Sequence, residues 1–185
     1  RRQRQMCIRD RTLRFIGMAV VAIIMSVNFA ACSDDDDDID GSQLEGTWGL
    51  VRSAGWDLCS EETEKYEWDC TCDPYNPNSS DDECYKLVIK KLTDNTYSVV
   101  AYCYYDNSSK WQMDGSSQTL TLNGNTLTVS QTNGEYGYFE SYANLIIESL
   151  TADKLTIRAK YDNVQTKSDP EHRHSSDYTE TFVRM

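Results

Sequence analysis

The sequence has little proline, glycine and histidine, and its acidic side chains far outnumber its basic ones. It contains 3 Pro, 9 Gly and 2 His in 185 residues, against 12 Tyr. This composition excludes collagen-like, coiled-coil and polytopic membrane proteins. The abundance of Tyr, together with many Thr and Val, favours β structure.

The charge imbalance argues against one kind of partner. Lys and Arg number 18 and Asp and Glu 30, which gives a net charge of −12. Residues 1–31 hold six Arg and one Asp, so the balance from Cys32 onward is 12 − 29 = −17. A surface this acidic repels the phosphates of nucleic acids and anionic lipid headgroups. We expect a single monomeric domain with no nucleic-acid partner.

The motifs of the common catalytic chemistries are missing. The sequence has no Ser or Cys nucleophile motif, no Gly-rich phosphate loop and no H-E-x-x-H zinc motif. Carboxylates are abundant, but no pair stands out for acid–base work. The pair His172-x-His174 is typical of solvated loop residues, and a shared metal is the less favoured interpretation. We expect no enzyme activity, no metal and no cofactor.

The first eleven residues read RRQRQMCIRDR. This string resembles translated sequencing-adapter sequence, and a natural basic leader is the alternative. On both interpretations Cys7 precedes the export signal described next. We therefore expect Cys7 to be absent from the folded domain.

Residues 12–31 resemble a bacterial lipoprotein signal peptide. Arg14 provides a positive flank, an uncharged and mostly apolar stretch follows, and two Ala precede Cys32. That order is typical of an export signal that ends in a lipobox. The resemblance implies that the Cys32 sulfur carries a diacylglycerol, which anchors the chain in a membrane. The alternative is a transmembrane helix, for which the apolar stretch is at the short limit.

Five consecutive aspartates, Asp34–Asp38, follow the lipidation site. Like charges repel, so such a run stays extended as a solvated spacer. The run also resembles the acidic signal that sends lipoproteins of certain anaerobic gut Gram-negative bacteria to the outer face of the outer membrane. We expect residues 32–43 to be a lipidated Cys with an acidic linker, and the protein to be anchored on the cell surface. A calcium site is not expected, because the run lacks the spaced ligands of a calcium loop.

From residue 44 onward, short segments of alternating apolar and polar residues are separated by turns. We predict strands over Leu44–Trp56, Tyr85–Leu92, Thr96–Tyr105, Gln118–Leu122, Thr126–Ser130, Tyr142–Leu150, Lys154–Tyr161 and Tyr178–Met185. Turn sequences such as Asn123-Gly124-Asn125 favour hairpins, and residues 163–177 are expected to form a polar loop. No segment has a sustained 3.6-residue apolar period. The pattern predicts an all-β fold, an antiparallel up-and-down β-barrel of eight to nine strands, because a meander of this length either closes or leaves exposed edges.

Residues 57–84 interrupt the strand pattern, and we predict a long polar loop held by disulfides. The candidate cysteines are Cys59, Cys70, Cys72, Cys84 and Cys103, an odd number that allows two bridges. The preferred pairing joins Cys84 to Cys103 across one hairpin, and Cys59 to Cys70 or Cys72. A zinc site made of Cys59, Cys70, Cys72 and Cys84 is less favoured, because an exported protein meets oxidising conditions.

The first and last predicted strands carry a family resemblance. Gly46-x-Trp48 opens the first strand, and Arg184 lies in the last. A Gly-x-Trp entry with a late basic side chain over the indole resembles the calycin pattern of lipocalins, fatty-acid-binding proteins and avidins. The segment Leu145–Thr151 looks like its counterpart in the lipocalin-like domains of gut-bacterial surface lipoproteins. The resemblance implies a lipocalin-like barrel over residues 44–185, closed where Gly46 and Trp48 meet Arg184.

Two non-enzymatic functions follow from this resemblance. A lipocalin-like barrel implies binding of a small hydrophobic or amphipathic molecule, in the interior or at the mouth under residues 57–84. The alternative is an interaction module or an accessory subunit of an outer-membrane assembly, with a filled barrel and a working outer surface. Strand propensity explains seven tyrosines that could otherwise line a pocket: Tyr97, Tyr102, Tyr104, Tyr105, Tyr136, Tyr138 and Tyr142.

Overall fold

A computed structural model describes residues 39–77, 84–105, 110–134, 137–165 and 171–185. The predicted signal peptide, Cys32 and the aspartate run lie outside these ranges. Asp38–Met185 forms one compact unit. Within the described ranges, no helix has the length and apolar character needed to cross a membrane.

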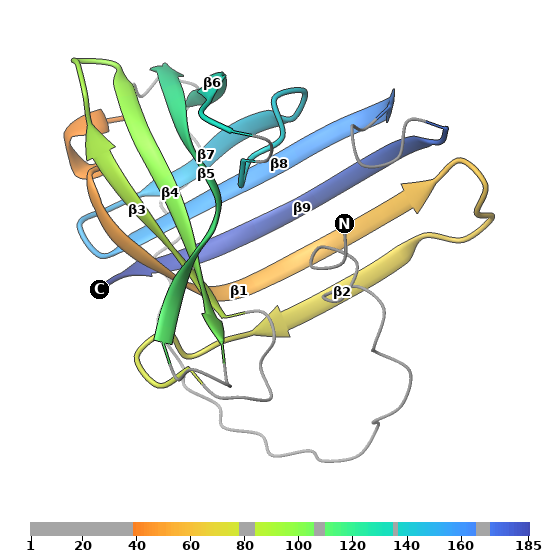
Figure 1. Ribbon diagram of the computed structural model, residues 1–185, viewed down its shortest axis with the longest axis horizontal. Coiled ribbons are helices and arrows are strands. Elements are labelled where there is room, and N and C mark those ends of the chain that lie inside the picture. Colours follow the sequence, from red (N-terminus) through yellow and green to blue (C-terminus); the bar gives the residue numbers. More distant parts are fainter. Residues whose placement is uncertain (1–38, 78–83, 106–109, 135–136, 166–170) are drawn as a thin grey trace, which may run out of the picture. The chain divides into compact units, whose positions relative to one another are not determined.

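In the part of the chain that the structure describes, nine antiparallel strands form one sheet, and eight of them close into a barrel. The strands are β1 (Gly46–Cys59), β2 (Tyr66–Thr71), β3 (Tyr85–Lys91), β4 (Thr96–Tyr105), β5 (Lys110–Asn123), β6 (Thr126–Thr132), β7 (Asn144–Leu150), β8 (Lys154–Gln165) and β9 (Arg173–Arg184), preceded by a short 3-10 helix η1 (Gly41–Gln43). The sheet order is β2-β1-β3-β4-β5-β6-β7-β8-β9, and β1 also pairs with β9 (Figure 1). Each strand from β3 to β8 pairs with the next along the chain, and β1 pairs with both β3 and β9, so the predicted all-β up-and-down barrel is confirmed.

The segment 57–84 is not one long loop, as the sequence predicted, because it contains β2. Residues Gly46 to Gly49 of β1 pair with β3, whereas Arg52 to Asp57 pair with β2. The second half of β1 therefore lies between β9 and β2, and β2 extends the sheet beyond the closed barrel (Figure 1). The strand is short, and the polar, proline-containing sequence around it hid its alternation of half-buried and exposed residues.

The predicted polar loop 163–177 is also largely wrong. β8 continues to Gln165 and β9 begins at Arg173, so both strands are longer than their apolar residues suggest. Polar residues can occupy these strand ends because the backbone of β9 pairs with β1 on one side and β8 on the other. β5 likewise begins at Lys110, well before its alternating Leu and Thr residues.

The predicted hairpins at the other turns are confirmed. β3 and β4 pair around residues 92–95, β5 and β6 around Gly124-Asn125, and β7 and β8 around residues 151–153. Asn123 is the last paired residue of β5, so the loop itself has two residues. Gly124 is the first residue of this loop and has φ 58°. A type II′ turn favours glycine at that position.

Buried apolar side chains fill much of the barrel interior. They come from every strand of the closed barrel and from the segments before β1 and β7. The cluster comprises Leu44, Trp48, Leu50, Leu87, Ile89, Tyr97, Val99, Ala101, Leu120, Leu122, Leu127, Phe139, Leu145, Ile147, Leu155, Ile157, Ala159 and Phe182. We call the part of this cluster around Trp48, Leu50 and Phe182 the apolar end.

Candidate functional site

The barrel closes where the start of β1 meets the end of β9. Trp48 pairs with Arg184 in the β1–β9 register, and the guanidinium carbon lies 4.2 Å from the indole centroid. The buried indole donates its Nε1–H to the Leu44 carbonyl at 2.8 Å. A cation over an indole face in this position contributes about 0.5–2 kcal/mol to stability.

Arg184 also binds backbone carbonyls around this end of the barrel. Its guanidinium donates to the carbonyls of Glu45 at 2.8 Å, Gln43 at 2.6 Å and Ala152. Gly46 has φ 153°, and a Cβ there would collide with the guanidinium. Glycine at this position therefore lets one side chain connect the entry of β1, the end of β9 and the β7–β8 turn.

A β-bulge separates the apolar end from a polar half of the barrel. The β1–β9 register shifts between Leu50 and Arg52, so that Leu50 opposes Phe182 while Ser53 opposes Glu180. Without the bulge, the regular alternation that buries Leu50 would also point Arg52 inward. The bulge leaves Arg52 outside, bound to Asp69 at 2.9 Å, and places Ser53 on the inner face.

Glu180 is the central group of the polar half. Its side chain points into the barrel and is 6% exposed. One carboxylate oxygen accepts a hydrogen bond from the Tyr85 hydroxyl, and the other accepts one from the Tyr138 hydroxyl at 2.9 Å. Burial raises the pKa of Glu180 to about 7, although both hydrogen bonds act to lower it. The carboxyl therefore changes its charge near neutral pH.

Three aromatic side chains on the same face of the sheet as Glu180 form what we call the aromatic patch: Tyr66, Trp68 and Tyr178. Each is half-buried. The ring of Trp68 lies 5.9 Å from that of Tyr178 and 6.1 Å from that of Tyr66. Trp68 donates its indole N–H to the Ser53 hydroxyl at 3.0 Å. Because Ser53 opposes Glu180 in the sheet, this bond connects the patch to the level of Glu180.

A glycine in β1 permits this arrangement. Gly55 opposes both Trp68 of β2 and Tyr178 of β9 in the sheet. A Cβ at residue 55 would overlap the Tyr178 side chain and the β9 backbone. Because residue 55 has no side chain, the rings of the two flanking strands come together over β1.

A second carboxylate lies at the end of the aromatic patch that contains Tyr66. Asp57 opposes Tyr66 and Ser176, and its Oδ1 is buried with no hydrogen-bond partner among the described residues. Burial raises the pKa of Asp57, and the charge of His174 opposes that effect. Trp68 and Tyr178 therefore lie between the levels of Glu180 and Asp57, and Tyr66 lies at the level of Asp57.

The segment between β6 and β7 enters the barrel beside Glu180. The buried amide of Gln118 accepts from the Phe139 N–H at 2.7 Å and donates to the Phe139 carbonyl at 2.7 Å. This pair of bonds reproduces the pairing of two strands and holds Phe139 in the core. The neighbouring Tyr138 is thereby positioned to reach Glu180.

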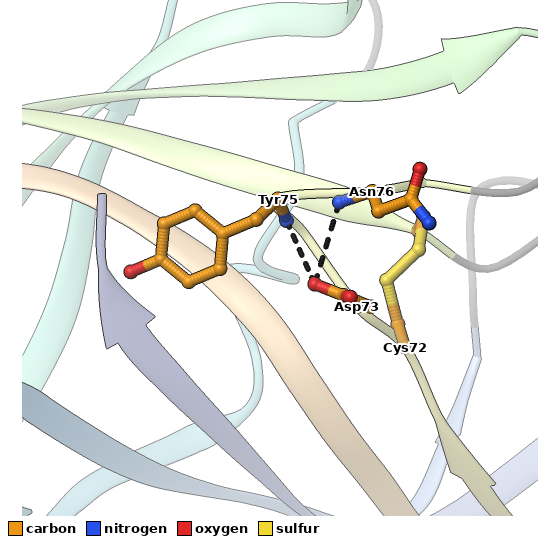
Figure 2. The surroundings of a disulfide bond; sticks show 5 residues. Cys72, Asp73, Tyr75 and Asn76 are labelled. Carbon is orange, nitrogen blue, oxygen red and sulfur yellow. Dashed lines mark hydrogen bonds between the residues drawn. A yellow bond between two sulfur atoms is a disulfide. The ribbon is translucent and has the colours of Figure 1, made fainter.

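The structure contains a disulfide between Cys72 and Cys84, so the preferred pairing of Cys84 with Cys103 is wrong. The Cα atoms of Cys72 and Cys84 lie 5.6 Å apart, at the point where the chain leaves β2 for β3 (Figure 2). Asp73 follows Cys72, and its carboxylate accepts from the backbone N–H groups of Tyr75 and Asn76, which forms a tight turn beside the disulfide (Figure 2). Cys84 precedes β3 and is turned toward β2 instead of across the hairpin.

The other cysteines occupy different places. The Cys103 thiol donates to Asp114 at 3.5 Å inside the barrel, and the Cys70 thiol donates to the Ser53 carbonyl at 3.3 Å. Cys59 ends β1 and also carries a thiol, which contradicts the expected second bridge from Cys59 to Cys70 or Cys72. The Cys72–Cys84 bond also uses two of the four sulfurs that the alternative zinc site requires.

The two histidines lie at the end of β9 that is far from Arg184. His172 Nε2 is 2.9 Å from Glu61 Oε1, and His174 opposes Cys59 in the sheet. His174 is thus on a strand and not in a loop. In the described ranges, no three His, Cys, Asp or Glu side chains are grouped in a way that could hold a metal ion.

Most of the tyrosines considered in the sequence have structural roles. Tyr97 is buried and donates to the Gly41 carbonyl at 2.9 Å, and Lys86 lies over the ring of Tyr102. Of that set, only Tyr138 binds Glu180, and Tyr136 lies outside the described residues. Glu180 itself was missed, although the alternation in Thr179-Glu180-Thr181-Phe182 places it on the face of Phe182.

A scan of protein-family models and a search of curated proteins find no match to this chain. Among solved structures, the siderocalin Ex-FABP, which functions through dual ligand specificities, is similar with a TM-score of 0.43 and 10% identity over 77% of this chain and 71% of its own. EF1p2_mFAP2b bound to DFHBI is similar with a TM-score of 0.38 and 11% identity over 78% and 96%. A de novo designed fluorescence-activating β-barrel has a TM-score of 0.34 and 10% identity over 80% and 99%.

Proposed function

We propose that the protein is a lipid-anchored lipoprotein of the outer membrane, exposed on the cell surface, whose barrel binds a small amphipathic molecule without catalysis. The anchor is Cys32, which follows a signal peptide over residues 12–31. The acidic linker places the barrel outside the lipid surface. No cofactor is needed for this function.

The observation that carries the binding proposal is the polar half of the barrel. There, the half-buried rings of the aromatic patch share one face of the sheet with a buried carboxylate that accepts from two tyrosine hydroxyls. Binding sites for small molecules combine apolar and aromatic walls with a few polar groups that orient the ligand. Structural packing alone does not require a carboxylate at this depth, because burial of a charged group costs free energy.

Native mass spectrometry of residues 33–185, purified from cells without detergent, tests the binding proposal. We expect a fraction of the protein to carry an added mass that is lost on mild denaturation. Trp68→Ala should reduce that fraction, while Trp111→Ala, on another strand, should leave it unchanged. Protein that carries no added mass after incubation with lipid extracts and amphiphile mixtures would overturn the proposal.

The anchor has its own test. The full-length protein, extracted from membranes, should have the intact mass of a chain that starts at a diacylglyceryl-modified Cys32. Cys32→Ala should abolish that mass and release the protein from the membrane fraction. Surface exposure is checked by protease treatment of intact cells, which should degrade the anchored protein.

The second candidate function is an interaction module or accessory subunit of an outer-membrane assembly. It is favoured by the density of the interior around Trp48 and Phe139, where buried side chains occupy the barrel. In this case the outer surface would carry the function. Crosslinking in intact cells that joins the barrel to one envelope protein, with no bound small molecule, would favour this function over ligand binding.

A further inference from the structure

We propose that the aromatic patch and the carboxylates around it select a cationic amphiphile, a molecule that carries a protonated amine or guanidinium next to an apolar body. This inference rests on the ligand-binding function proposed above and names the chemical class of its ligand. The cation would lie against the rings of Trp68 and Tyr178, between the levels of Glu180 and Asp57. The apolar body would cover the rest of the patch.

The sign of the charges on the inner face favours a cationic ligand. Glu180, Asp57 and Asp114 come from three different strands, and the register places each on the face that lines the barrel. By contrast, Arg52 and Arg158 lie on the outer face, bound to Asp69 and Asp177. Along the described inner face from Ser53 to Asp57 and from Ser176 to Glu180, the sheet presents no Lys or Arg. An anionic ligand would therefore meet carboxylates without a compensating cation.

The chemistry of the aromatic rings also favours a cation. The faces of Trp and Tyr attract cations, and the interaction grows when water is excluded. The same sheet already shows this contact on its outer face, where the Lys65 ammonium lies 3.5 Å from the centroid of Trp56. On the inner face, the Trp68 ring lies 5.9 Å from that of Tyr178, which is two residues before Glu180 on β9. A ligand cation would make with Trp68 the contact that Lys65 makes with Trp56 outside.

Asp57 favours a ligand that donates hydrogen bonds. Its Oδ1 is buried and has no hydrogen-bond partner among the described residues. A buried acceptor without a partner is unfavourable. An ammonium or guanidinium N–H would satisfy this oxygen, which a fatty-acid carboxylate cannot do.

The test compares three ligands that share a twelve-carbon tail: dodecylammonium, dodecyl maltoside and dodecanoate. Isothermal titration calorimetry with residues 33–185 is run at pH 8 and below the micelle concentration of each ligand. We expect dodecylammonium to bind at least about tenfold more tightly than the neutral and anionic ligands, because one charge pair in a partly buried site contributes more than about 1.4 kcal/mol. Equal affinity for the cation and the neutral ligand would overturn the inference and leave the proposed function standing. Failure of all three to bind would count against both.

Two variants separate the site from the general acidity of the chain. Glu180→Gln keeps the shape of the side chain and removes its charge, so it should lower the affinity for dodecylammonium about tenfold and leave that for dodecyl maltoside unchanged. Glu148→Gln, an exposed residue of β7, removes the same charge elsewhere and should change neither affinity. If Glu180→Gln disturbs folding, Asp57→Asn supplies the same comparison. A cation preference that is equally reduced by Glu148→Gln would reflect net charge and refute the assigned site.

Discussion

The two ends of this barrel are built from the same strands by different chemistry. At the apolar end, Trp48 and Phe182 are fully buried, and the guanidinium of Arg184 lies against an indole and binds backbone carbonyls. In the polar half, β1 and β9 continue past the bulge and bring Glu180, Asp57 and half-buried rings onto the same inner face. The apolar end closes the barrel. The polar half contains buried polar groups that packing of a core does not require.

The contrast shows how one β-bulge can divide a strand into a structural part and a part available for function. Before the bulge, β1 shares its edge with β3 and completes the barrel. After it, β1 pairs with β2 and directs a different set of residues inward. Three measurements test this division of the strand.

The largest change in the free energy of unfolding is expected from removal of an indole, which can be compared at two positions. Trp48→Ala should lower the free energy of unfolding by about 3–5 kcal/mol, because it leaves a cavity in the apolar end and uncovers Arg184. Trp68→Ala should cost about 1–2 kcal/mol, since its ring is half-buried and donates a hydrogen bond to Ser53. Urea unfolding followed by circular dichroism measures both. Equal losses would contradict the division into a structural and a functional end.

A smaller change in the free energy of unfolding, about 3 kcal/mol, is expected when the pH is raised, and it comes from Glu180. Its pKa in the folded protein, about 7, lies above the ordinary value of 4.5. Between these values the folded state holds more protons than the unfolded state, so the stability that this group contributes is greatest below pH 4.5 and is lost as pH rises through 7. Glu180→Gln should flatten the urea-unfolding profile between pH 5 and pH 8. An unchanged slope in that variant would show that Glu180 is not the group responsible.

The smallest of the three changes in stability is expected from loss of the Cys72–Cys84 disulfide, which links the end of β2 to the start of β3. Cys72 and Cys84 are 12 residues apart, and loss of a disulfide that closes so short a loop should cost about 2–3 kcal/mol. Cys72→Ser, measured by urea unfolding, should show this loss, whereas Cys59→Ser should cost much less. If Trp68 fluorescence also changes in Cys72→Ser, the bond positions the aromatic patch as well as stabilising the chain.

The hairpins and the closure of the barrel could be predicted because they depend on local patterns. Alternating Leu and Thr around Asn123-Gly124 and the Gly46-x-Trp48 entry are visible without coordinates. β2 and the strand extensions could not be predicted, because their polar residues are stabilised by backbone pairing with distant strands. The Cys72–Cys84 bond was missed for the same reason, since the position of Cys84 depends on where β2 ends.

The local sequence specifies the strand class, most turns and the residues that close the barrel, because the alternation of side chains and turn preferences act over a few residues. The placement of Glu180 beside Trp68 and Tyr178 depends on contacts between β1, β2 and β9, which lie far apart in the chain. A bulge of one residue reverses which side chains face inward, so the polar half exists only once the strands are paired.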